Sequence, residues 1–208
     1  PHESMSTDET TRKSYHHGDL REALLAAAQQ IIAEEGVDAV TMRGLSQRVG
    51  VSRTAPYRHF EDKAALLAAV AQQGFEQLIS ALRQVRTGDP TLSPLTRFER
   101  MGIGYVRFAV QNPTAYRLMY GVDAIQADDH PALRTIISDT HQELIAILRE
   151  CKEAGLIQAW RSRDVAVTVW SACHGLSLLL IDGHLPGVED LVIERMAAIL
   201  SAGLGATN

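Results

Sequence analysis

The sequence predicts an all-α protein of about nine helices, with an N-terminal helix-turn-helix domain followed by a larger helical domain. Three observations predict this fold. Apolar residues recur at three- and four-residue intervals along most of the chain, and no run alternates as a strand would. Glycine and proline separate these apolar stretches. The chain has 208 residues, 46% of them hydrophobic, which is enough to bury the core of one or two domains.

The first part of the chain supplies four of these helices. Thr41, Ser52 and Asp62 can cap the second, third and fourth helix, because their side chains accept hydrogen bonds from free N–H groups. Gly36 and Gly50 end the first two. The four helices are expected at residues 20–36, 41–50, 54–59 and 62–83, before Gly88-Asp89-Pro90 breaks the chain.

The rest of the chain supplies five more helices. Asn112-Pro113 ends the first of them, an acidic loop spans residues 121–130, and Gly155 stops the long third one. They are expected at residues 95–110, 114–120, 133–151, 164–182 and 189–202.

The stretch 165–181 is apolar on almost every face. A transmembrane span is one interpretation, but this length, interrupted by Ser171, His174 and Ser177, is marginal for a hydrocarbon core of roughly 30 Å. A helix buried on two sides, one of them against a partner subunit, is favoured.

The charge of the whole chain argues against nucleic-acid binding, because 20 basic residues face 25 acidic ones, for a net charge of −5. The distribution is uneven, however. Residues 41–63 hold five basic side chains and two acidic ones, net +3, whereas residues 1–11 carry only acids. A local basic patch on an acidic chain indicates a surface for phosphates. A charge of this size is also common on solvated helices.

Residues 41–60 have the pattern of a helix-turn-helix, with two short helices joined by a tight turn at Gly50. Leu45, Val49 and Val51 supply a small apolar core, which leaves the polar face of the next helix free for a major groove. Pro56 lies in that next helix. Because proline has no N–H, the helix is expected to begin a residue late or under strain.

A longer succession of residues surrounds this motif. Tyr15-His16-His17-Gly18-Asp19-Leu20-Arg21 precedes the first helix, and then come Gly36, Thr41, Gly50-Val51-Ser52, Tyr57-Arg58-His59-Phe60, Lys63 and Leu66-Leu67. In this order and spacing, residues 15 to about 70 resemble the DNA-binding domain of the TetR family of bacterial transcriptional regulators. Trp170-x-x-x-His174-Gly175 is similar to a pattern in the C-terminal domain of one TetR subgroup. The resemblance implies a ligand-responsive repressor.

The resemblance also implies residues that contact DNA. Helix starts at Thr41 and Ser52 present N–H groups to phosphates, and Lys63 adds a cation. Tyr57 and His59 are similar to the family's phosphate- and base-contacting positions, although Tyr57 can also be a packing residue. The expected set is Thr41, Arg43, Ser52, Arg53, Thr54, Ala55, Pro56, Tyr57, His59 and Lys63. Residues 12–17 either reach the adjacent groove or form a solvated tail.

Aromatic residues and methionines gather within residues 98–120. An apolar lining with a few polar groups is typical of a small-molecule site, but the same residues can be plain core. The resemblance favours the pocket, and His174 remains open as either a pocket residue or a core histidine. The expected lining is Phe98, Met101, Tyr105, Phe108, Tyr116, Met119, Tyr120, Trp170 and His174.

We therefore expect a flexible tail at 1–14, a DNA-binding domain at 15–62, a connecting helix at 63–88 and a ligand-binding and dimerisation domain at 89–208. The expected partners are a palindromic double-stranded DNA operator, a small-molecule effector and a second copy of the chain, paired through 164–182 and 189–202. The effector would shift the population away from the DNA-competent state. No cofactor, metal or membrane is expected, and the location is expected to be cytoplasmic.

The histidines and cysteines suggest two other functions. An enzyme is disfavoured because the eight histidines form no HExxH motif or ligand cluster, and no nucleophile elbow or phosphate-binding glycine loop is present. A redox sensor would use Cys151 and Cys173. Both lie on apolar helix faces, which is typical of inert core thiols.

Overall fold

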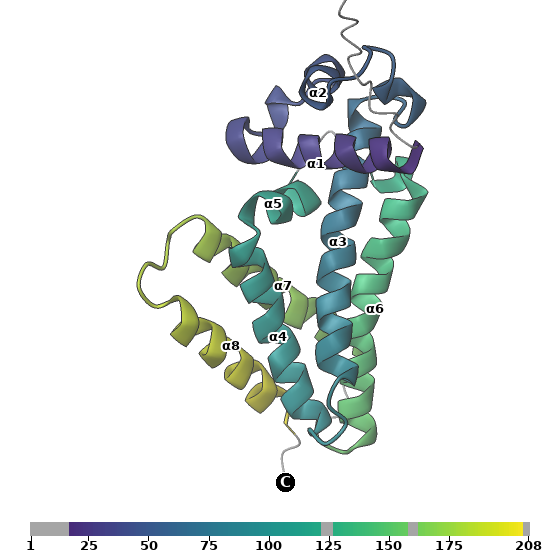
Figure 1. Cartoon of the computed structure of the whole chain (residues 1–208). Coiled ribbons are helices and arrows are strands. Elements are labelled where there is room, and N and C mark those ends of the chain that lie inside the picture. The colour runs from purple at the N-terminus through teal and green to yellow at the C-terminus, as the bar shows by residue number, and fades with distance from the viewer. Residues whose placement is uncertain (1–16, 122–126, 158–161, 206–208) are drawn as a thin grey trace, which may run out of the picture. The chain divides into compact units, whose positions relative to one another are not determined.

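The computed structural model of the chain describes residues 17–121, 127–157 and 162–205. Eight α-helices and three short 3₁₀ helices make up most of these residues (Figure 1). The described residues contain no strand, and one isolated bridge pairs Ile157 with Gly205. The all-α prediction is confirmed. The count is eight α-helices instead of nine because the expected helix at 54–59 is a 3₁₀ turn. Residues 12–16, which belong to the segment that either reaches the adjacent groove or forms a solvated tail, lie outside the described part.

The chain divides into two compact units between Glu61 and Asp62. The first contains α1 (His17–Glu35), η1 (Val37–Ala39), α2 (Met42–Val49) and η2 (Pro56–Arg58). The second contains α3 (Lys63–Thr87), α4 (Pro94–Gln111), α5 (Pro113–Gly121), η3 (Ala127–Asp129), α6 (Pro131–Glu153), α7 (Ser162–Ile181) and α8 (Glu189–Leu204). Helix α3, expected as a connecting segment, is counted within the second unit.

Side chains fix the ends of several helices. The Thr41 hydroxyl accepts a hydrogen bond from Gly44 N at 3.0 Å, and the Asp62 carboxylate accepts one from Ala65 N at 2.8 Å. Gly50 closes α2 with a φ of 76°, a left-handed conformation that favours glycine. These predicted caps are confirmed. Helices α4, α5 and α6 each begin at a proline, one or two residues earlier than expected, because proline suits the first turn.

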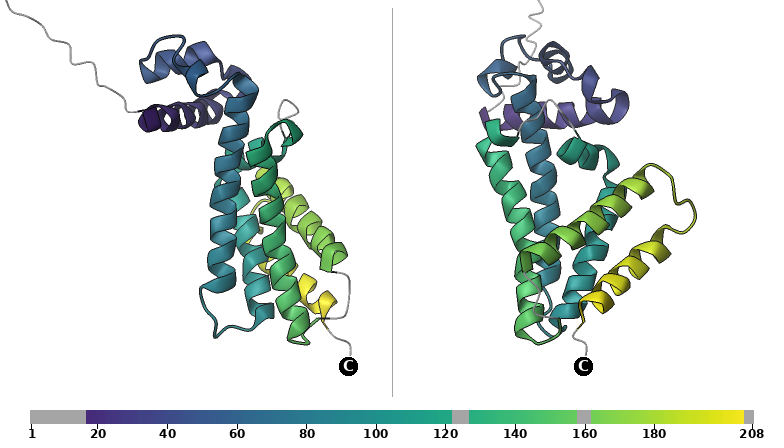
Figure 2. Two further views of the ribbon diagram at one scale, coloured as in Figure 1. Left: turned by 90° about the vertical axis from the view of Figure 1, so that its right-hand side faces the viewer. Right: turned by 180° about the vertical axis from the view of Figure 1, so that it is seen from behind.

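The core of the second unit forms around α3 and α4. Helix α3 packs against α4, α5 and α6, while α7 and α8 both pack on α4 (Figure 2). Phe75, Val106 and Ile147 are fully buried there. Gly74 allows a close approach of α5, since a Cβ at this position would lie 2.7 Å from the sulfur of Met119.

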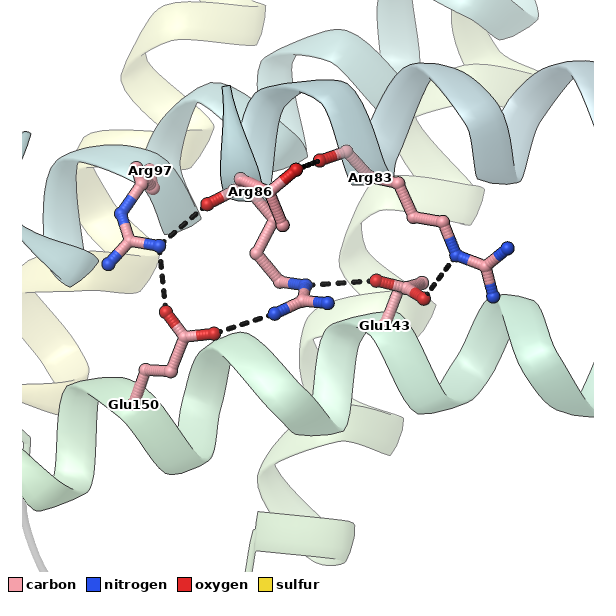
Figure 3. Close-up of polar contacts among 6 residues, drawn as sticks. Arg83, Arg86, Arg97, Glu143 and Glu150 are labelled. Atoms are coloured by element: carbon pink, nitrogen blue, oxygen red, sulfur yellow. Dashed lines mark hydrogen bonds and ion pairs between the residues drawn. The ribbon is translucent and has the colours of Figure 1, made fainter. Parts of the chain in front are cut away.

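A chain of ion pairs joins the end of α3, the start of α4 and the C-terminal half of α6 (Figure 3). Buried Glu143 accepts from Arg83 Nε at 2.6 Å and from Arg86 Nε at 2.9 Å. Glu150 accepts from Arg86 at 2.8 Å and pairs with Arg97 at 2.8 Å. Burial alone would raise the pKa of Glu143, but the hydrogen bonds from the two arginines outweigh it and lower that pKa.

Candidate nucleic-acid interface and internal cavity

The segment after the Gly50 turn departs from the predicted helix. Pro56 cannot donate to Ser52 O, so Ala55 N bonds that oxygen instead, at 3.0 Å. Two further bonds of this three-residue spacing, from Arg58 N to Ala55 O and from His59 N to Pro56 O, form the 3₁₀ helix η2. Ser52 does not cap this helix, and its hydroxyl lies 3.3 Å from that of Thr54. The expectation of a helix capped by Ser52 was therefore wrong, and the 3₁₀ helix that replaces it begins at Pro56, two residues after the expected start at Thr54.

The expected DNA-contacting residues of the first unit differ in exposure. Thr41, Arg43, Ser52, Arg53, Thr54 and Tyr57 are exposed, and 56% of the Tyr57 surface is accessible. His59 is half-buried. Ala55 and Pro56 are buried, so their side chains do not lie on the surface that the exposed residues form. Lys63 is half-buried at the start of α3, in the second unit.

Two basic side chains of the first unit contact residues distant from them in sequence. Arg48 of α2 forms an ion pair with Glu34 of α1. The guanidinium of Arg21 lies over the ring of Phe60, 5.3 Å from its centre. Part of the basic charge counted in residues 41–63 is thus balanced by α1, and Arg43, Arg53 and Arg58 remain as exposed cations.

The second unit contains a cavity of about 40 Å³. Five of the nine expected residues line it, namely Phe98, Met101, Tyr105, Tyr120 and Trp170. Tyr116 and His174 lie in the adjoining hydrogen-bond cluster, Met119 faces Gly74, and Phe108 is half-buried outside the lining. The remaining lining residues were not anticipated: Leu82, Gly102, Thr140, His141, Leu144, Val169 and Cys173. For the lining residues on α6, the apolar stripe of residues 133–151 was the sequence feature that could have indicated them.

Three tyrosine hydroxyls form a hydrogen-bonded cluster beside the cavity. The Tyr105 hydroxyl lies 2.9 Å from that of Tyr116 and 3.2 Å from that of Tyr120. It accepts the indole N–H of Trp170 at 3.1 Å. The Tyr116 hydroxyl lies 2.6 Å from Nδ1 of His174. Burial raises the pKa of all three tyrosines and lowers the pKa of His174, so these side chains are neutral near pH 7.

A larger groove of about 440 Å³ lies between α6 and α7. It shares His141, Leu144 and Trp170 with the cavity. The rings of His141 and Trp170 meet edge to face with their centres 5.0 Å apart. These two side chains therefore stand between the groove and the cavity. Arg163 is the one formally charged residue in the groove lining.

Neither a metal site nor a reactive thiol emerges from the described residues. They contain no group of three His, Cys, Asp or Glu side chains able to hold a metal ion. Cys151 and Cys173 are both buried. Burial raises the pKa of their thiols to about 11 and about 12. Because the thiolate is the reactive form, this environment does not favour the redox-sensor alternative.

Both units match known families. The family described as "Bacterial regulatory proteins, tetR family" matches residues 24–70, and "Tetracyclin repressor-like, C-terminal domain" matches residues 98–202. The chain is 28% identical over 187 residues to the HTH-type transcriptional activator FasR of Mycolicibacterium smegmatis, covering 89% of this chain and 83% of that protein. It is 40% identical over 63 residues to the HTH-type transcriptional repressor Rv1474c of Mycobacterium tuberculosis, covering 30% of this chain and 34% of that protein.

A solved structure is similar over nearly the whole chain. It is that of a protein of unknown function from Rhodococcus sp. RHA1, with 30% identity and a TM-score of 0.81. The match covers 93% of this chain and 100% of that one.

Proposed function

The chain belongs to the TetR family of bacterial transcriptional regulators, and we propose that it is a homodimeric repressor released from a palindromic operator by a small molecule. Regulation of transcription through DNA is the function of this family. The finer assignments, namely repression, the operator symmetry, the residues involved and a cytoplasmic location, are part of the proposal.

The proposed DNA surface consists of the exposed residues around the Gly50 turn. Arg43 and Arg53 supply charge for phosphates, and Thr54 and Tyr57 present polar groups next to them. A 3₁₀ turn in place of a longer helix offers only a short row of side chains. Specificity for bases is therefore assigned to Thr54 and its immediate neighbours.

The proposed dimer interface consists of the outer faces of α7 and α8. Large apolar side chains are exposed there, including Val167 and Leu179 on α7 and Leu191 and Ile199 on α8. Helix α7 is long and apolar enough to cross a membrane, by length and composition alone, and one third of its most apolar stretch is buried. An apolar face on a regulator supports pairing with a second copy.

The proposed control of DNA binding runs through α6. One face of α6 lines the cavity with Thr140, His141 and Leu144. Another face holds α3 through Glu143 (Figure 3). A ligand that displaces α6 would therefore displace α3, which continues in sequence from the DNA-binding unit. The ligand acts only if it binds the two states of the dimer with different affinity.

The double role of α6 is the observation that carries this proposal. Selection of DNA fragments from a random library by the full chain tests it. We expect a palindrome with half-sites about one helical turn, or a multiple, apart. Enrichment of no sequence, or of a single asymmetric site bound by a monomer, would contradict it.

A further inference from the structure

The cavity of the second unit holds no formal charge. None of its lining residues is Asp, Glu, Lys or Arg. Burial lowers the pKa of His141, raises that of the Cys173 thiol to about 12, and raises the pKa of Tyr105 and Tyr120. All four are neutral near pH 7. An ion that enters would lose its hydration without meeting a counter-charge, which is strongly unfavourable.

The hydrogen-bond geometry orders the protons of the tyrosine cluster. Tyr105 donates to the oxygen of Tyr120. Because a phenol has one proton, Tyr105 accepts from Tyr116, as it does from Trp170. Tyr116 then has no proton left for His174. We assign the ring proton of His174 to Nδ1, from which it is donated to Tyr116 across 2.6 Å.

This order leaves the hydroxyl proton of Tyr120 available. The proton of Tyr105 is donated to Tyr120, and its two lone pairs accept from Tyr116 and Trp170. The hydroxyl of Thr140 donates to the carbonyl oxygen of Ile136. Tyr120 lines the cavity, and edge-to-face contacts with Phe75 and His174 fix its ring. Within the contacts of the described cluster, the Tyr120 hydroxyl is therefore the group that keeps a proton for a ligand in the cavity.

We propose that the effector is an uncharged, mainly apolar molecule with a carbonyl or ether oxygen, which accepts a hydrogen bond from the Tyr120 hydroxyl. The inference rests on the proposed function, since it names the ligand class of the same site. A cavity of about 40 Å³ admits the oxygen and only the adjoining carbons. The rest of the molecule extends past His141 and Trp170 toward the groove.

Three linear probes of matched length test the class on the full chain by titration calorimetry. The first is the methyl ketone heptan-2-one. The second, called the methylene analogue, is 2-methylhept-1-ene, in which a =CH2 group replaces the carbonyl oxygen. The third is heptanoate. We expect the ketone to bind about fivefold more tightly than the methylene analogue. Heptanoate should bind more than tenfold more weakly than the ketone. Equal affinity for ketone and analogue, or tightest binding of heptanoate, would overturn the proposal.

The substitution Tyr120→Phe locates the hydrogen bond. It should lower the ketone affinity about fivefold, to that of the methylene analogue, whose own affinity stays unchanged. Tyr116→Phe is the matched control, because it deletes a buried hydroxyl of the same cluster that does not line the cavity. That variant should keep the ketone preference. A preference that survives Tyr120→Phe assigns the contact elsewhere and overturns the proposal. If Tyr120→Phe fails to fold, the relative affinities of the wild type for the three probes decide whether the proposed ligand class holds.

DNA binding is measured separately on the same samples, by the anisotropy of a labelled operator. If no DNA is bound while the ketone preference holds and disappears in Tyr120→Phe, the proposed function fails and the ligand class stands. If DNA binds but the ketone preference is absent, only the ligand class fails.

Discussion

The indole N–H of Trp170 donates a hydrogen bond to the hydroxyl of Tyr105 at 3.1 Å, although 65 residues separate the two in sequence. This contact joins α7 to α4 beside the cavity. Since α7 also carries part of the proposed dimer face, the cavity wall and the subunit contact share one helix.

The substitution Trp170→Phe keeps an aromatic ring but deletes this hydrogen bond. We expect the free energy of unfolding to fall by about 1 kcal/mol, because a hydrogen bond of a partly buried group is lost. Operator affinity should change less than the ligand response. Chemical denaturation and operator anisotropy measure the two effects. A large loss of operator affinity with an intact ligand response would remove Trp170 from the ligand site.

Tyr57→Ala and Thr54→Ala test the proposed DNA surface, and Lys63→Ala tests the phosphate contact expected of Lys63. Tyr57→Ala and Lys63→Ala should weaken binding to all sequences, and Lys63→Ala should reduce the salt slope by about 1, because one phosphate contact is lost. Thr54→Ala should mainly alter sequence preference. Anisotropy titrations at several salt concentrations measure these effects. Arg149→Ala, an exposed α6 cation, is the control. Unchanged binding in all three variants would rule out this surface.

The ion pairs of Glu143 predict a pH-dependent contribution to stability. Its pKa is lower in the folded chain than the ordinary value of 4.5, so the folded state favours the carboxylate. The stabilisation is complete above that value and disappears as the pH falls through the lowered pKa. Glu143→Gln should lower the free energy of unfolding by about 1–3 kcal/mol at pH 7. The difference between wild type and variant should become smaller at acidic pH.

Denaturation of both proteins across this pH range measures that difference. Glu153→Gln, on an exposed part of the same helix, should behave as wild type. If Glu143→Gln lowered the free energy of unfolding by the same amount at every pH, the packing of this side chain, and not its charge, would account for the loss.

Pairing through α8 is tested by Ile199→Glu. Ile199 is 70% exposed in the single chain, so the charge should not disturb the fold of the protomer. It should prevent an apolar contact between copies, because a carboxylate would be buried without a partner. Sedimentation should show a dimer for the wild type and a monomer for the variant. A dimer in both would place the interface elsewhere. Arg149→Gln, at an exposed site on α6, changes the net charge by the same amount and provides the control.

Local chemistry made much of the fold predictable. Thr41 and Asp62 cap their helices, and Gly50 ends α2, because each residue type satisfies free backbone groups at a helix end. The 3₁₀ turn at Pro56 was only partly predictable. A missing N–H predicts a disturbed start, but whether the chain recovers an α-helix depends on the contacts of the following residues.

The cavity was less accessible from the sequence. Periodicity places Thr140 and Leu144 on the apolar face of α6, but it does not tell whether a neighbour fills the space opposite them. Aromatic clustering predicted Tyr105 and Tyr120 as lining residues. The same clustering did not separate them from Tyr116, which packs behind them, because packing order depends on how helices distant in sequence meet.

The central claim is that occupancy of the cavity controls DNA binding, and Gly102 gives its most direct test. A Cβ at Gly102 would make only ordinary contacts, 3.9 Å from Cys173 and Met196, so a larger side chain can enter the cavity. The measurement is the release of labelled operator from wild type and Gly102→Leu across a library of small uncharged compounds. We predict that compounds that release the operator from the wild type have no further effect on the variant, because the leucine side chain occupies the space they need. Equal release from both proteins would contradict the account.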